Sequence, residues 1–78
     1  MRQLSTAEFH DYLVKNDECF IVNPHENLAF RFVDKDGETS YFCKPEGGQE
    51  KEIRYDDDYF NEAWLFSMVL TKEEYDNY

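Results

Sequence analysis

An Asp36-Gly37 pair between two segments of alternating hydrophobicity constrains the fold of this chain more than any other feature of its sequence. Such a pair favours the two-residue turn that matches the twist of antiparallel strands, so it predicts a β-hairpin. The resulting register pairs Lys35 with Glu38, Phe32 with Tyr41, and Phe30 with Cys43. Residues that share one face of this hairpin are expected to face the core. These are Leu28, Phe30, Phe32, Tyr41 and Cys43.

The opposite face of the hairpin mixes polar and apolar side chains: Ala29, Arg31, Val33, Ser40, Phe42 and Lys44. Either a helix partly covers this face, or Phe42 is exposed for contact. Residues 18 to 23 are rich in β-formers and predict a further strand. Residues 51 to 55 alternate charged and apolar side chains, which is typical of an edge strand. We therefore expect an antiparallel sheet of three to four strands.

The N-terminal segment carries the signals of a capped helix. Ser5 and Glu8 have the spacing of a capping box, and Leu4 and Phe9 have the spacing of a hydrophobic staple. These signals predict a helix from about Thr6 to Asn16.

The C-terminal third contains two more helix signals and one ambiguous run. Three aspartates at 56 to 58 favour a helix start, because acids are stabilised at a helix N-terminus. Thr71 and Glu74 repeat the spacing of Ser5 and Glu8 and predict a second capping box. The apolar run at 63 to 70 fits either a helix or a buried strand, and we favour the helix. The predicted fold is one small α+β domain at 1–78, with an N-terminal helix, the sheet with its central Asp-Gly hairpin, and one or two C-terminal helices.

The charge of the chain is strongly negative and unevenly distributed. Eighteen acids stand against eight Lys and Arg, which gives a formal net charge of −10. The last 23 residues hold seven acids and one base. A protein that binds a phosphate backbone must offer Lys and Arg, so this composition disfavours direct binding to nucleic acid. Seven Phe, six Tyr and one Trp make the chain too aromatic for a disordered acidic tail.

The metal-binding patterns in the sequence fit poorly. Asp34, Asp36 and Glu38 resemble the start of an EF-hand loop, but Gly37 is too early and Pro45 occupies the position of the bidentate Glu. The three aspartates at 56 to 58 are adjacent in sequence, so on a capping turn their carboxylates point away from one another and do not converge on one cation. We expect no metal site.

Catalytic patterns are equally weak. His10 and His25 are the only imidazoles, and no spacing brings either of them to Cys19 or Cys43, as a nucleophile and its base would require. The glycines lack the spacing of a phosphate-binding loop. We therefore expect no catalytic residues, no cofactor and no enzymatic activity.

Two cysteines and no recognisable signal peptide favour a cytoplasmic protein, in the host cell if the chain is viral. The longest apolar run is too short to cross a bilayer.

Acids interleaved with large aromatics can imitate the phosphates and bases of a nucleic acid. In composition the chain is similar to small inhibitors of host defence enzymes that phages and mobile elements encode, including anti-CRISPR and anti-restriction DNA mimics. The leading expectation is a small inhibitor that occupies a basic, nucleic-acid-handling partner. The expected contact residues are Asp56, Asp57, Asp58, Tyr59, Glu62, Glu73, Glu74, Tyr75 and Asp76.

Two alternatives stay open from the sequence. The chain could be a self-associating adaptor, or an antitoxin- or immunity-type partner of one protein, that uses the exposed sheet face around Val33, Phe42 and Ile53. The acids could also be only a solvated face. Oligomeric state is not indicated.

Overall fold

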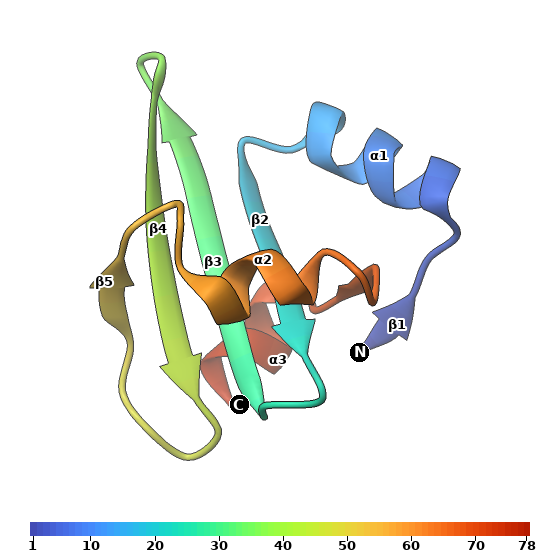
Figure 1. The fold of residues 1–78 in the computed structure, drawn as a ribbon. Coiled ribbons are helices and arrows are strands. Elements are labelled where there is room, and N and C mark those ends of the chain that lie inside the picture. The colour runs from blue at the N-terminus through green and yellow to red at the C-terminus, as the bar shows by residue number, and fades with distance from the viewer.

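A computed structural model describes residues 1–78, and its centre is one antiparallel sheet of six strands in the order β1-β6-β2-β3-β4-β5 (Figure 1). The elements are β1 (Arg2–Gln3), α1 (Thr6–Lys15), β2 (Glu18–Asn23), β3 (Leu28–Lys35), β4 (Glu38–Pro45), β5 (Lys51–Ile53), α2 (Asp58–Ala63), β6 (Met68–Val69) and α3 (Lys72–Asp76). The prediction of three to four strands was wrong, because two strands of two residues each extend the sheet beyond β2.

The predicted hairpin is confirmed in its register. β3 and β4 pair as Lys35 with Glu38, Phe32 with Tyr41 and Phe30 with Cys43. The turn residues Asp36 and Gly37 have φ angles of 55° and 81°, the positive values that this two-residue turn requires. The strands at both sides also form, as β2 and as the three-residue edge strand β5.

The preferred helix across residues 63 to 70 was wrong. α2 ends at Ala63, a turn follows, and β6 then pairs Met68 and Val69 with β1 on one side, while Val69 also pairs with Ile21 of β2 on the other. The turn places Ser67 at φ 51°, and its carbonyl accepts a hydrogen bond of 2.9 Å from the amide of Leu4. β1 thus gives the end of the apolar run a strand partner. A helix over these residues could not form this pairing.

Both predicted capping boxes are confirmed. Ser5 caps α1 and accepts from the amide of Glu8, whose carboxylate accepts from the Ser5 amide in return. Thr71 and Glu74 do the same at the start of α3. Each box satisfies amides that a helix start leaves without partners.

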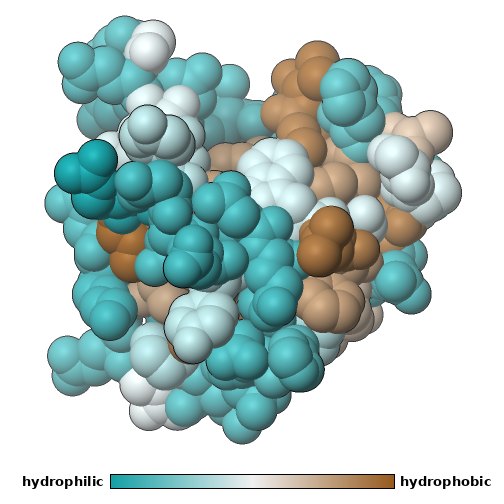
Figure 2. Space-filling view, viewed as in Figure 1, coloured by the Kyte–Doolittle hydropathy of each residue, from teal (hydrophilic) through white to brown (hydrophobic).

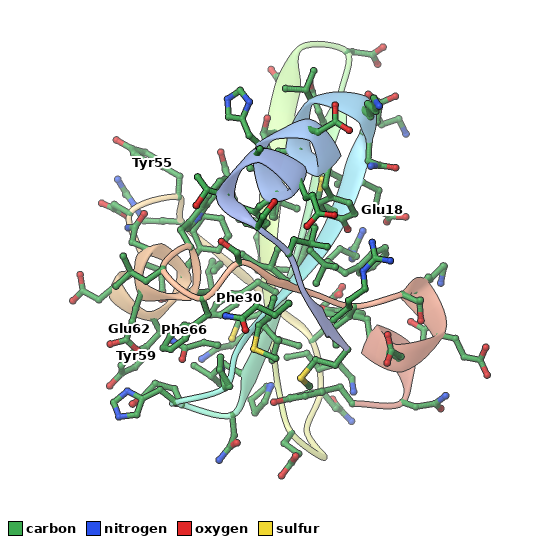
Figure 3. The ribbon with its side chains drawn as sticks, turned by 90° about the vertical axis from the view of Figure 1, so that its right-hand side faces the viewer. Glu18, Phe30, Tyr55, Tyr59, Glu62 and Phe66 are labelled. Carbon is green, nitrogen blue, oxygen red and sulfur yellow. The ribbon has the colours of Figure 1, made fainter.

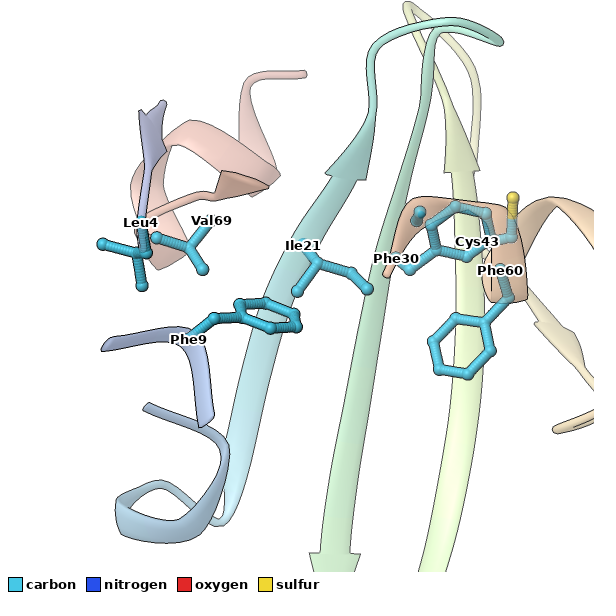
Figure 4. Packing of buried hydrophobic residues seen from close by; sticks show 8 residues of the cluster. Leu4, Phe9, Ile21, Phe30, Cys43, Phe60 and Val69 are labelled. Carbon is cyan, nitrogen blue, oxygen red and sulfur yellow. The ribbon is translucent and has the colours of Figure 1, made fainter. Parts of the chain in front are cut away.

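Helices cover both faces of the sheet. α1 and α2 pack on the face that carries Ile21, Phe30 and Cys43 (Figure 4). The hairpin pattern predicted that Phe30 and Cys43 face the core, and this is confirmed. α3 packs on the opposite face, where Tyr75 lies against Phe20 with ring centroids 5.2 Å apart. Of the two alternatives left open for that second face, the structure therefore has the one in which a helix partly covers it. No helix is long and apolar enough to cross a membrane.

Candidate functional site

The nine predicted contact residues lie on two separate faces of the molecule. Asp56, Asp57, Asp58, Tyr59 and Glu62 precede or belong to α2, and Glu73, Glu74, Tyr75 and Asp76 belong to α3. Figure 3 shows α2 and α3 on opposite sides of the sheet, with the strands between them. One flat partner surface cannot contact both groups at once.

Most of the α3 group already has partners within the protein. Tyr75 is only 3% exposed, and its hydroxyl donates a hydrogen bond of 2.5 Å to Glu50. Glu74 pairs with the N-terminal amine and caps α3, and these two interactions lower the pKa of its carboxyl. Asp76 pairs with Lys72 at 3.0 Å. Of this group, only Glu73 is exposed without an ion pair.

More side chains of the α2 group than of the α3 group are free to contact a partner. Asp57 is the N-cap of α2 and accepts from the amides of Tyr59 and Phe60, at 3.0 Å each, so its role is structural. Asp58 is exposed, and half of the Tyr59 side chain is accessible. Tyr59 and Glu62 lie side by side on the outer side of α2 (Figure 3). We call Glu26, Asp56, Asp58, Tyr59 and Glu62 the α2 surface.

A buried asparagine attaches the β2–β3 turn to α2. The side-chain amide of Asn23 donates to Glu62 at 2.8 Å and to the carbonyl of Tyr59 at 3.0 Å. Its side-chain oxygen accepts from the amides of His25 and Glu26. Asn23 is 0% exposed, and all of its polar atoms are satisfied. Sequence reasoning missed this residue, whose only signal was a polar side chain at the end of an apolar strand.

His25 stands between two acids of the α2 surface. Its Nδ1 lies 3.5 Å from Glu26 and 3.6 Å from Glu62. One imidazole nitrogen and two carboxylate oxygens within 4.8 Å of one another are the groups in this chain that could hold a divalent cation. The same three groups form ion pairs when the imidazole is protonated.

A second feature of this side of the molecule is a cavity of about 270 Å³, which we call the notch. It lies between α1 and the β3–β4 hairpin, and Figure 2 shows the surface hollowed between its two upper lobes. The residues that line it are Leu13, Val14, Asn16, Asp17, Cys19, Phe32, Asp34, Thr39, Tyr41 and Trp64. Hydrophilic side chains predominate on the left of this view, and apolar ones gather on the right.

Three aromatic rings of the notch stand close together. The ring centroid of Phe32 is 6.3 Å from that of Tyr41 and 5.8 Å from that of Trp64. Trp64 also contacts Phe60 of α2, at 5.9 Å between centroids, so the notch adjoins that helix. The sequence pattern assigned Phe32 and Tyr41 to the core face, but it did not show that this end of the face is open.

A larger cavity, about 410 Å³, lies between β2, β6, α1 and α3. Its charged lining combines Arg2 and Lys72 with Glu18 and Glu74. Because charges of both signs line it, this cavity does not favour a partner of one charge.

The second face of the sheet carries a satisfied ionic network instead of an open contact area. Arg31 binds Glu50 through two hydrogen bonds of 3.0 and 2.9 Å and Glu18 through one of 3.0 Å. Its guanidinium also lies 4.2 Å from the ring centroid of Phe42. The bonds from Arg31 lower the pKa of the Glu50 carboxyl.

Neither cysteine has the lowered thiol pKa that favours a nucleophile. Burial raises the pKa of the Cys19 thiol to about 11, and it also raises the pKa of Cys43. At neutral pH both stay protonated, and the thiolate is the reactive form.

Comparisons with protein-family models, with characterised proteins and with solved structures find no match to this chain. They indicate neither a family nor a function for it.

Proposed function

We propose that this protein is a small, non-enzymatic inhibitor that binds a basic, nucleic-acid-handling protein through the α2 surface and occupies its nucleic-acid site. One observation carries the proposal. Only six of the eighteen carboxylates lie within 4.0 Å of a Lys, an Arg or the N-terminal amine, and within the α2 surface only Asp56 does. Surfaces that serve solubility alone normally mix both signs.

The α2 surface combines the two contact types that a nucleic acid offers. Its carboxylates supply negative charge in place of phosphates, and the half-exposed Tyr59 supplies a flat ring in place of a base. Tyrosine is also enriched at the energetic centres of interfaces. A net charge of −10 would steer the protein toward a basic groove and speed the encounter.

Hydrogen bonds within the protein also hold the α2 surface in place. Asp57 caps the helix, and the buried Asn23 fixes both Glu62 and the turn that carries Glu26. Preorganised side chains lose less conformational entropy on binding, which favours affinity. We place this activity in the cytoplasm, in an infected or invaded host cell if a phage or mobile element encodes the chain.

Affinity capture with two charge-matched variants tests the proposal. The site variant combines Glu26→Gln, Asp56→Asn and Asp58→Asn, and it leaves the structural residues Asp57 and Glu62 unchanged. The control variant combines Glu46→Gln, Glu52→Gln and Glu73→Gln, three exposed acids elsewhere that form no ion pairs. Both variants have a formal charge of −7, because each loses three of the charges that make −10.

We expect the wild-type protein to capture a basic protein from an extract of the cell in which it acts, and to release it as salt rises from about 0.05 to 0.5 M. The site variant should capture at least about fivefold less of that same protein, and the control variant about as much as the wild type. Equal losses in both variants, or capture that salt does not weaken, would contradict the proposal.

The adaptor function through the sheet face has less support. Arg31 lies over Phe42, and Ile53 pairs with Tyr41 and so belongs to the α1 and α2 face. Val33 and Phe42 are both half-buried. These three residues do not form one open apolar patch.

A further inference from the structure

The notch has a chemical character that the α2 surface lacks, because it combines aromatic rings with unpaired acids in a concave site. Asp17 and Asp34 are exposed at the notch, and neither has a Lys or Arg within 4.0 Å. The amide of Asp34 donates to the carbonyl of Asp17 at 2.7 Å, which holds the two residues next to each other.

The basic residues near the notch in sequence are directed elsewhere. Lys15 pairs with Asp11, one turn back in α1, at 2.9 Å. Lys35 follows Asp34 in β3, so its side chain lies on the opposite face of the sheet. The acids of the notch therefore lack a cation that the chain itself could supply from these positions.

From this geometry we infer that the notch binds the side chain of an arginine that the partner protein inserts. A guanidinium is planar, stacks on aromatic rings and donates hydrogen bonds to carboxylates. Phe32, Tyr41 and Trp64 supply the rings, and Asp17 and Asp34 supply the acceptors. The cavity of about 270 Å³ lies just below the range of pockets for drug-sized ligands, about 300 to 1,000 Å³, and so fits one long side chain.

The source of the arginine rests on the proposed function, since a partner with a nucleic-acid groove is rich in Arg. The affinity of the notch for a guanidinium does not rest on it. An arginine bound in the notch would fix the orientation of the partner, because attraction between opposite charges alone is not directional.

A small probe tests the notch without the partner. N-acetyl-arginine methylamide is titrated into the protein and compared with the neutral isostere N-acetyl-citrulline methylamide. Trp64 is the only tryptophan of the chain and lines the notch, so its fluorescence reports changes around this site. We expect the arginine probe to change this signal with a Kd on the order of 1 mM, and the citrulline probe to bind about fivefold more weakly.

A charge-matched pair of variants locates the site. The double variant Asp17→Asn and Asp34→Asn keeps the aromatic rings and should bind the arginine probe about fivefold more weakly. The control, Asp36→Asn with Glu38→Gln at the tip of the same hairpin, should bind within about twofold of the wild type.

Equal binding of both probes, or an unchanged affinity in the Asp17 and Asp34 variant, would overturn the inference. If the arginine probe does not bind as expected while partner capture still depends on the α2 surface, the inferred arginine site is wrong and the proposed function stands. If the arginine probe binds as expected and no basic partner is captured, the proposed function falls and the site remains.

Discussion

Arg31 shows how one residue stabilises the second face of the sheet. Its side chain is 22% exposed, and it joins β3 to Glu18 of β2 and to Glu50, which in turn accepts from the Tyr75 hydroxyl of α3. A charge-assisted network of this kind is costly to break, because the remaining partners stay half-buried without compensation.

We expect Glu50→Gln to lower the free energy of unfolding by about 1 to 2 kcal/mol at pH 7, a value reduced for the partial exposure of the pair. Urea denaturation measures the change, with Glu52→Gln as the control, since Glu52 is exposed and has no ion pair. The folded state lowers the pKa of Glu50, so its stabilising contribution is present above the pKa of the unfolded chain and is lost as pH falls below it. The difference between wild type and Glu50→Gln should therefore shrink below about pH 4. A constant difference down to pH 2 would contradict this role.

Residue-level predictions from the sequence succeeded where the interaction is local. Ser5 with Glu8, and Thr71 with Glu74, are three residues apart, so their chemistry is visible in the sequence. The pairing of Arg31 with Glu50 depends on how β3, β4 and the loop after β4 are arranged, and no spacing rule indicates it.

The elements follow the same distinction between local and distant partners. β3 and β4 adjoin each other in sequence, so the Asp36-Gly37 turn was sufficient to predict their register. β6 has only two residues, and its partners in β1 and β2 are more than 40 residues away. An apolar run indicates burial but not its strand partner, and this is why the helix interpretation failed.

Ser67 allows a test of the turn that leads into β6. A serine at φ 51° is less favourable than a glycine, because a side chain crowds the backbone in the left-handed region. We expect Ser67→Gly to raise the free energy of unfolding by about 0.5 kcal/mol. Ser40→Gly, in the middle of β4, should lower it by about 0.5 to 1 kcal/mol. Thermal or urea unfolding of both variants measures the changes, and a destabilised Ser67→Gly would contradict a left-handed backbone at Ser67.

The whole molecule has far more negative charge than its ion pairs neutralise. Twelve carboxylates have no Lys, Arg or terminal amine within 4.0 Å, and the acids of α2 and α3 face opposite directions. Sequence showed the excess of acid but not its division between two faces, because that depends on which side of the sheet each helix packs.

Screening of this charge should stabilise the folded state. We expect the Tm to rise by about 4 °C as KCl increases from about 0.05 to 0.5 M, because like charges repel most in the compact form. The control variant with three fewer charges should gain less. Differential scanning calorimetry checks both values, and a Tm that falls with salt would show that ion pairs dominate over repulsion.

Competition for the nucleic-acid site of the captured partner tests the central proposal most directly. The partner is loaded with a fluorescent oligonucleotide, and anisotropy is followed as this protein is added. We expect full displacement of the oligonucleotide. The site variant at Glu26, Asp56 and Asp58 should need about tenfold more protein for the same displacement, and the control variant should match the wild type. A stable complex in which the partner holds both the oligonucleotide and this protein would contradict it.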